Sequence, residues 1–113
     1  MAIKTKSIYE PKEESDGLRI LVTRYWPRGI KKEHFNSWHK ELAPSKHLLQ
    51  SFKEGSIDWL HFEFLYRLEM NAQYASIMEA SEIASKTTIT LLCHEREGQN
   101  CHRHILKQLI ASL

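Results

Sequence analysis

The sequence predicts a small single α/β domain over residues 1–113, in which a short, partly parallel three-stranded sheet is packed by about five helices. Two observations lead to this prediction. Runs of strand composition lie at 3–9, 18–25 and 87–93, and segments with the helical spacing of apolar residues fill much of the chain between the second and third runs. Because that crossover is long enough for a right-handed parallel connection, we expect the second and third strands to be parallel neighbours.

Each strand is predicted from its own composition. The first, Ile3 to Tyr9, contains lysines that suit an exposed sheet edge, and its direction relative to the second strand stays open. The second, Leu18 to Tyr25, has an apolar centre and ends before residues 26–29, where Pro and Gly stop regular pairing. The third, Thr87 to Cys93, consists of β-branched and apolar residues without glycine, proline or charge, which is typical of a buried strand.

Five helical segments are expected. They cover residues 31–42, 45–52, 57–72, 76–85 and 101–113. The first places Phe35, Trp38 and Leu42 on one stripe, and Ser45 is a suitable N-cap for the second. The third carries more aromatic surface than one packing face uses, which predicts burial on two sides or a homodimer through this helix. These aromatic residues are Trp59, Phe62, Phe64 and Tyr66.

Composition narrows the function classes. With 42% hydrophobic and 27% charged residues, the chain is an ordinary globular domain, and its formal net charge of +2 does not argue for nucleic acid. No apolar run approaches the roughly 18 residues of a membrane span, and the N-terminus lacks the apolar stretch of a secretory signal. Two cysteines do not make a disulfide framework. We therefore expect a cytoplasmic protein with no membrane partner and no cofactor.

The polar loop and helix start at residues 93–103 form the candidate site, because open α/β proteins place ligands outside the carboxyl ends of their strands. Asn100 is expected to cap the last helix, whose first free N–H groups favour an anion such as phosphate, and Arg103 adds a forked cationic donor. If the second and third strands are parallel neighbours, then Arg24, Trp26 and Arg28 approach this loop. The leading prediction is a small anionic ligand bound there.

A thiol-dependent enzyme is the first alternative. The helix start would lower the pKa of Cys101 and make it a nucleophile, with Glu95 or His102 as its acid–base partner. The pair Cys93 and Cys101 lacks the Cys-x-x-Cys spacing of redox motifs. The position at which thiol phosphatases and rhodaneses have an arginine is Gln99. Whether the protein is an enzyme stays open.

Two further alternatives concern a metal ion and nucleic acid. The ligand types would allow a metal at Cys93, Cys101 and His102, but a single loop would have to supply the whole site, so no metal is expected. Cations and aromatic rings interleave at residues 24–32, which is the composition of a nucleic-acid surface, although no recognised nucleic-acid motif is present.

Several stretches together resemble a known family. Asp16 to Gly29, which contains Arg-x-Trp-Pro-Arg-Gly, is similar to the N-terminal signature of the YeaO-like family of uncharacterised prokaryotic proteins, a domain of unknown function. Residues 38–45, 92–95 and 101–103 also look like that family. The resemblance covers nearly the whole chain and implies a small single-domain α/β protein. It implies no particular activity.

Overall fold

The computed structural model describes residues 2–96 and 98–113. In this part of the chain one four-stranded sheet has the order β1-β4-β2-β3, and every neighbouring pair is parallel. The α/β prediction is confirmed, but the expected three strands and about five helices were wrong in detail. The strands are β1 (Ile3–Ser7), β2 (Leu18–Leu21), β3 (Ser37–Trp38) and β4 (Ile89–Cys93), and the α-helices are α1 (Lys46–Lys53), α2 (Trp59–Asn71), α3 (Tyr74–Lys86) and α4 (His102–Ala111).

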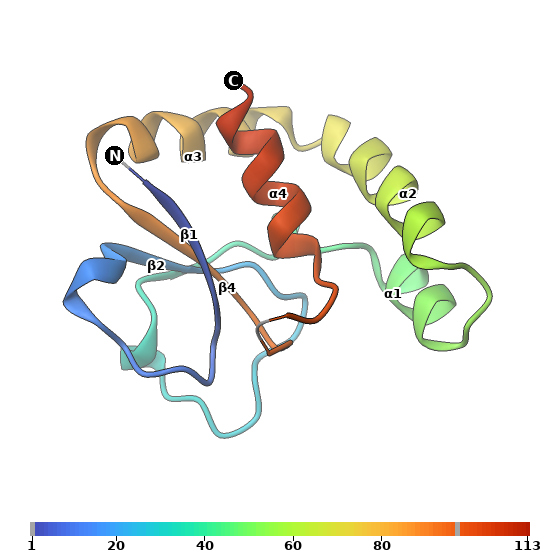
Figure 1. Ribbon diagram of the computed structural model, residues 1–113, viewed down its shortest axis with the longest axis horizontal. Helices are drawn as coiled ribbons and strands as arrows, with labels where there is room; N and C mark the ends of the chain where they lie inside the picture. The colour runs from blue at the N-terminus through green and yellow to red at the C-terminus, as the bar shows by residue number, and fades with distance from the viewer. Residues whose placement is uncertain (1, 97) are drawn as a thin grey trace.

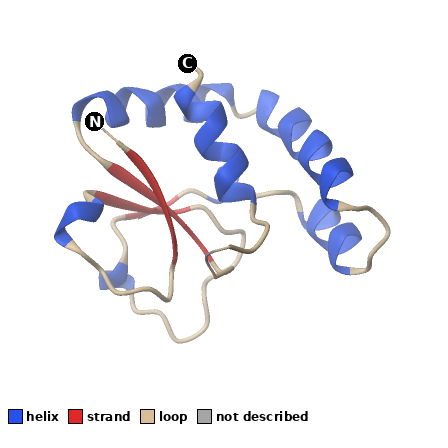
Figure 2. Ribbon diagram, viewed as in Figure 1, coloured by secondary structure: helices blue, strands red, loops and turns tan. Residues whose placement is uncertain are grey.

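The α-helices lie on one side of the sheet. Figures 1 and 2 show α4 passing in front of α3 above the strands, and α1 with α2 as an arm on the right. Alternate residues of β4 point to opposite faces, so that Ile89, Leu91 and Cys93 join the main core formed with the helices. Loops cover the other face, where Leu92 belongs to a smaller apolar cluster with Leu21.

The predicted helix over residues 31–42 was wrong. Two 3-10 turns, Lys32–His34 and Lys40–Leu42, flank the short strand β3 there. This strand is drawn onto the sheet edge by pairing with β2, and the indole Nε1 of Trp38 donates to the Thr23 carbonyl at 2.6 Å. Tertiary hydrogen bonds therefore override the helical spacing of the apolar residues in this segment.

Helix α2 buries only part of its aromatic surface. Phe62 is 2% exposed and Tyr66 is fully buried, whereas Leu60, Phe64 and Leu68 are 76%, 61% and 50% exposed. Burial on two sides is thus excluded for this helix, and a homodimer through it stays a prediction. In the described residues, no helix is long and apolar enough to cross a membrane.

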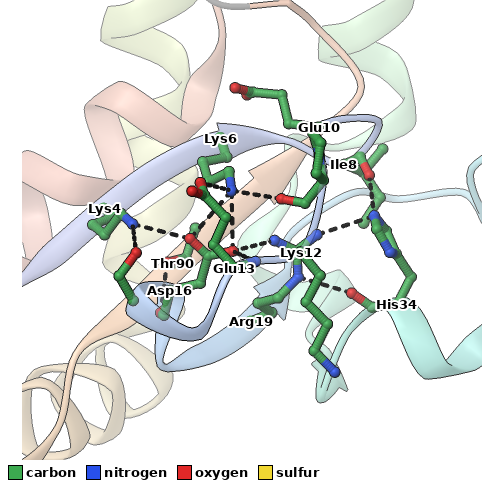
Figure 3. Close-up of polar contacts among 12 residues, drawn as sticks. Lys4, Lys6, Ile8, Glu10, Lys12, Glu13, Asp16, Arg19, His34 and Thr90 are labelled. Atoms are coloured by element: carbon green, nitrogen blue, oxygen red, sulfur yellow. Dashed lines mark hydrogen bonds and ion pairs between the residues drawn. The ribbon is translucent and has the colours of Figure 1, made fainter.

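The loop-covered face of the sheet contains a buried ionic cluster centred on Asp16, which precedes β2 (Figure 3). The carboxylate accepts hydrogen bonds from Lys6 Nζ on β1 and from the guanidinium of Arg19 on β2, and its backbone carbonyl accepts one from Thr90 Oγ1 of β4 at 2.7 Å. Burial opposes ionisation of Asp16, but the Glu13 backbone N–H and these cations hold its pKa below the usual range. Asp16 thereby links three strands through its carboxylate and its backbone carbonyl.

Gly17 separates this cluster from β2 and is expected to tolerate no side chain. Its φ is +64°, and a Cβ atom placed there would lie 2.0 Å from the Thr88 carbonyl oxygen. We therefore expect Gly17→Ala to lower the unfolding free energy by well over 1 kcal/mol in urea titrations. Gly55→Ala is the matched control, because φ there is +78° but nothing lies within 4 Å of the new Cβ atom. Equal losses in the two variants would contradict a steric role for Thr88.

Candidate functional site

A cleft of about 550 Å³ opens where β2 and β4 end. The residues after β2 supply one wall, α1 supplies a second, and the loop from β4 to α4 supplies a third. The parallel pairing of β2 with β4 brings these segments together, as the sequence predicted. Six of the residues expected at the site line this cleft: Arg24, Trp26, Arg28, Glu95, Asn100 and His102.

The wall that follows β2 presents cations and an aromatic ring. Arg24 is fixed by a hydrogen bond of 2.7 Å from its Nε to the Pro44 carbonyl. Trp26 is 44% exposed, and its Nε1 donates to the Ile30 carbonyl at 2.8 Å. Arg28 also lines the cleft. This segment therefore places positive charge beside an exposed indole ring whose orientation is fixed by a hydrogen bond.

Arg103 does not line the cleft, contrary to the expectation that it is the main anion contact. Its side chain is 1% exposed, and its two terminal nitrogens donate to the carbonyls of Glu95 at 2.8 Å and Arg96 at 3.3 Å. The guanidinium thus stabilises the loop between β4 and α4. The sequence also offers Glu97 as a carboxylate partner for Arg103, and Glu97 lies outside the described residues.

The start of α4 is also one residue later than predicted. Asn100 was expected to be the N-cap, but the extended residue before the helix is Cys101, with φ −153° and ψ 145°. Cys101 makes no capping hydrogen bond through its side chain. Asn100 lies in the loop and lines the cleft instead. Its amide is therefore placed to contact a ligand rather than the helix backbone.

Both cysteines and His102 gather beneath the cleft. Their ligand atoms all lie within 4.8 Å of one another. The Cys93 Sγ lies 3.4 Å from Nε2 and 3.6 Å from Nδ1 of the imidazole, and the Cys101 Sγ lies 3.8 Å from Nδ1. The imidazole Nε2 is 2.6 Å from the Val22 carbonyl, so this nitrogen must carry a proton and donate it. The Nδ1 atom is left to interact with sulfur.

The two thiols differ in acidity. Burial raises the pKa of Cys93 well above its usual value, and the neighbouring Cys101 raises it further. Burial also opposes ionisation of Cys101, but hydrogen bonds from Cys93 and His102 outweigh it and hold the pKa of Cys101 well below the usual range. Cys101 is therefore the more acidic of the two thiols.

Burial also shifts the pKa values of two ionisable side chains that line the cleft. It raises the pKa of Glu95 and lowers that of His94, so both groups favour their neutral forms. Sequence reasoning missed His94, Tyr9 and Lys53 as lining residues. Tyr9 follows β1, a strand that is parallel to β4, so its position at the same sheet edge was predictable once the direction of β1 was known. Lys53, at the end of α1, belongs to no motif.

A family model described as "Active DUF488-N3 subclade" matches residues 3–113. The chain belongs to this DUF488-N3a family. The DUF488-N3a chain is 36% identical over 115 residues to the uncharacterized protein YeaO of Escherichia coli K12, with all of both chains covered. It is 28% identical over 110 residues to uncharacterized proteins of Mycobacterium bovis and of Mycobacterium tuberculosis H37Rv, covering 96% of this chain and 92% of each relative. No solved structure matches it significantly. The YeaO-like resemblance is thus confirmed.

Proposed function

We propose that this protein binds a small organic anion, such as a phosphate ester, in the cleft at the carboxyl ends of β2 and β4. The observation that carries the proposal is the charge of the lining. Arg24, Arg28 and Lys53 face the cleft, and its described carboxylate, Glu95, is held towards the neutral form by burial. A volume of about 550 Å³ lies within the range of small-molecule sites.

Arg28 is the residue best placed to contact the anion. In the described part of the chain, its guanidinium has no hydrogen bond or ion pair, whereas its carbonyl accepts one from the Tyr9 hydroxyl at 3.1 Å. Arg24 keeps its orientation through Pro44. The exposed ring of Trp26 supports an aromatic or sugar ring of the same ligand. This arrangement favours a ligand in which a planar ring is joined to an anionic group.

Replacing Arg28 with Met is expected to weaken anion binding by about ten- to a hundredfold, since a charge-assisted hydrogen bond contributes about 1.5–3 kcal/mol. Isothermal titration with phosphate, sulfate and a nucleoside monophosphate measures the loss. Arg28→Lys should recover part of the affinity, because it keeps the charge but loses the fork.

The control is Arg67→Met on α2, where the arginine pairs with Glu63 at 2.9 Å outside the cleft. Its affinity for each anion should equal that of the wild type. Undiminished binding in Arg28→Met would overturn the proposal. Binding of a single-stranded oligonucleotide in place of the small anions would support the nucleic-acid alternative.

A second candidate function is thiol-dependent catalysis. It is favoured by the lowered pKa of Cys101, whose thiolate is stabilised by Cys93 and His102 beneath the cleft. In this reading Cys101 is the nucleophile, His102 is its proton partner, and Glu95, with its raised pKa, is a general acid facing the ligand. Cys101 itself is 2% exposed, so a substrate would reach it from the side lined by His102.

A further inference from the structure

The two cysteines and His102 have the composition of a site for a thiophilic metal ion. They come from separate elements, because Cys93 ends β4 while Cys101 and His102 begin α4. All three residues are buried, with exposed fractions of 0%, 2% and 6%. The three ligand atoms lie within 4.8 Å of one another. The strand–loop–helix connection therefore converges two sulfurs and one imidazole on a single point.

The distances from Nδ1 of His102 to the two sulfurs match two edges of a zinc tetrahedron. With a Zn–S bond of about 2.3 Å and a Zn–N bond of about 2.0–2.1 Å, tetrahedral angles place sulfur and nitrogen about 3.6 Å apart. The Cys93 and Cys101 sulfurs lie 3.6 Å and 3.8 Å from Nδ1 of His102. The Cys93 sulfur is almost equally distant from the two ring nitrogens. Joint binding of a metal by this sulfur and Nδ1 therefore requires the sulfur to shift towards Nδ1.

The imidazole is already oriented for such a role. Its Nε2–H donates to the Val22 carbonyl at 2.6 Å, and metal-binding histidines characteristically donate their second ring N–H to a carbonyl or carboxylate. With Nε2–H engaged in this contact, Nδ1 is the ring nitrogen that can offer its lone pair to a metal beside the sulfurs. The ring edge also packs on Tyr66, with centroids 5.5 Å apart. The ligand is thus held before any metal arrives.

We propose that Cys93, Cys101 and His102 bind a divalent zinc ion through Sγ, Sγ and Nδ1. Zinc binding displaces the thiol protons to solvent, and the ion balances the charge of two buried thiolates. Because His102 also lines the cleft, the three-residue cluster borders the proposed anion site. Three protein ligands with one open position is the arrangement of catalytic rather than structural zinc.

Cobalt is the direct probe, because Co²⁺ replaces zinc in such sites and reports sulfur ligation by its absorption. The full-length protein, reduced and stripped of metal, should take up one Co²⁺ per chain with sulfur-to-cobalt charge-transfer bands and strong tetrahedral bands in the visible, and one equivalent of Zn²⁺ should abolish both. The proposal would be overturned if the stripped protein has a native circular dichroism spectrum and two titratable thiols but shows none of these cobalt bands. This outcome needs no variant.

The variants Cys101→Ser and His102→Ala are expected to lower zinc affinity by at least about a hundredfold in competition with a chromophoric chelator, since loss of outer partners alone costs ten- to a hundredfold. His61→Ala on the exposed start of α2 is the control and should bind zinc like the wild type. Unchanged affinity in Cys101→Ser would place the metal elsewhere and overturn the assignment. The inference does not depend on anion binding, which is titrated in the metal-free protein, so either can fail alone.

Discussion

Asp16→Asn is expected to lower the unfolding free energy by about 3–5 kcal/mol, the usual cost of leaving a buried charge without its partner. Asp16 and Arg19 are both fully buried, and Lys6 is 8% exposed. An amide in place of the carboxylate leaves two buried cations facing a neutral group. Because small domains are stable by only about 5–15 kcal/mol, this single change should shift the urea midpoint strongly.

Glu13→Gln is the matched control for this prediction. Its carboxylate also pairs with Lys6, at 3.0 Å, but that side chain is 62% exposed. Exposed ion pairs contribute about 0–1 kcal/mol, so the loss should be small. Similar losses in Asp16→Asn and Glu13→Gln would show that burial of the cluster contributes nothing.

The same carboxylate makes the stability depend on pH. The pKa of Asp16 in the folded protein is below its unfolded value, so its contribution is present above about pH 4 and is lost as pH falls towards the folded pKa. Part of the acid destabilisation of the wild type should therefore be missing in Asp16→Asn. Unfolding free energies measured between pH 7 and about pH 3 in both proteins test this.

The second large effect concerns the thiolate of Cys101. In metal-free protein, one thiolate per chain should be visible by its ultraviolet absorbance at pH 7 and below, because the pKa of Cys101 is well below the usual value. In His102→Gln the imidazole is gone, and the pKa should rise towards about 8.5, where only a few per cent of the thiol is ionised at pH 7. The thiolate population at pH 7 should thus fall by more than about tenfold.

Cys93→Ser and Cys101→Ser assign this signal to one sulfur. The low-pH thiolate should vanish in Cys101→Ser and persist in Cys93→Ser, because burial raises the pKa of Cys93. The serine hydroxyl in Cys93→Ser remains a hydrogen-bond donor for the Cys101 thiolate. A wild-type protein with no thiolate below pH 8 would remove the basis for Cys101 as a nucleophile.

The sequence was informative where local composition and tertiary environment agree. The buried strand β4 and the convergence of Arg24 and Arg28 with the loop after it follow from apolar runs and from the length of the crossover. Segment 31–42 was misread because its apolar residues do not by themselves separate a helix from an edge strand. Its pairing with β2 decides between the two structures. No periodicity encodes such a long-range hydrogen bond.

The site was misread for a related reason. An arginine in the first turn of a helix looks available to an anion, yet Arg103 is turned back on carbonyls of its own loop. Likewise, the sequence places Cys93 at the end of a buried strand, but it does not predict that the sulfur reaches the ring of His102. Both facts depend on the path of the connection between β4 and α4, which spacing along the chain does not specify.

The position of β4 in the sheet has a consequence for the order of folding. β1 and β2 do not pair with each other, since β4 lies between them and joins both. β4 follows both strands along the chain, after α1, α2 and α3. The sheet is therefore completed only when a late strand inserts between two early ones, and such non-local pairing forms slowly.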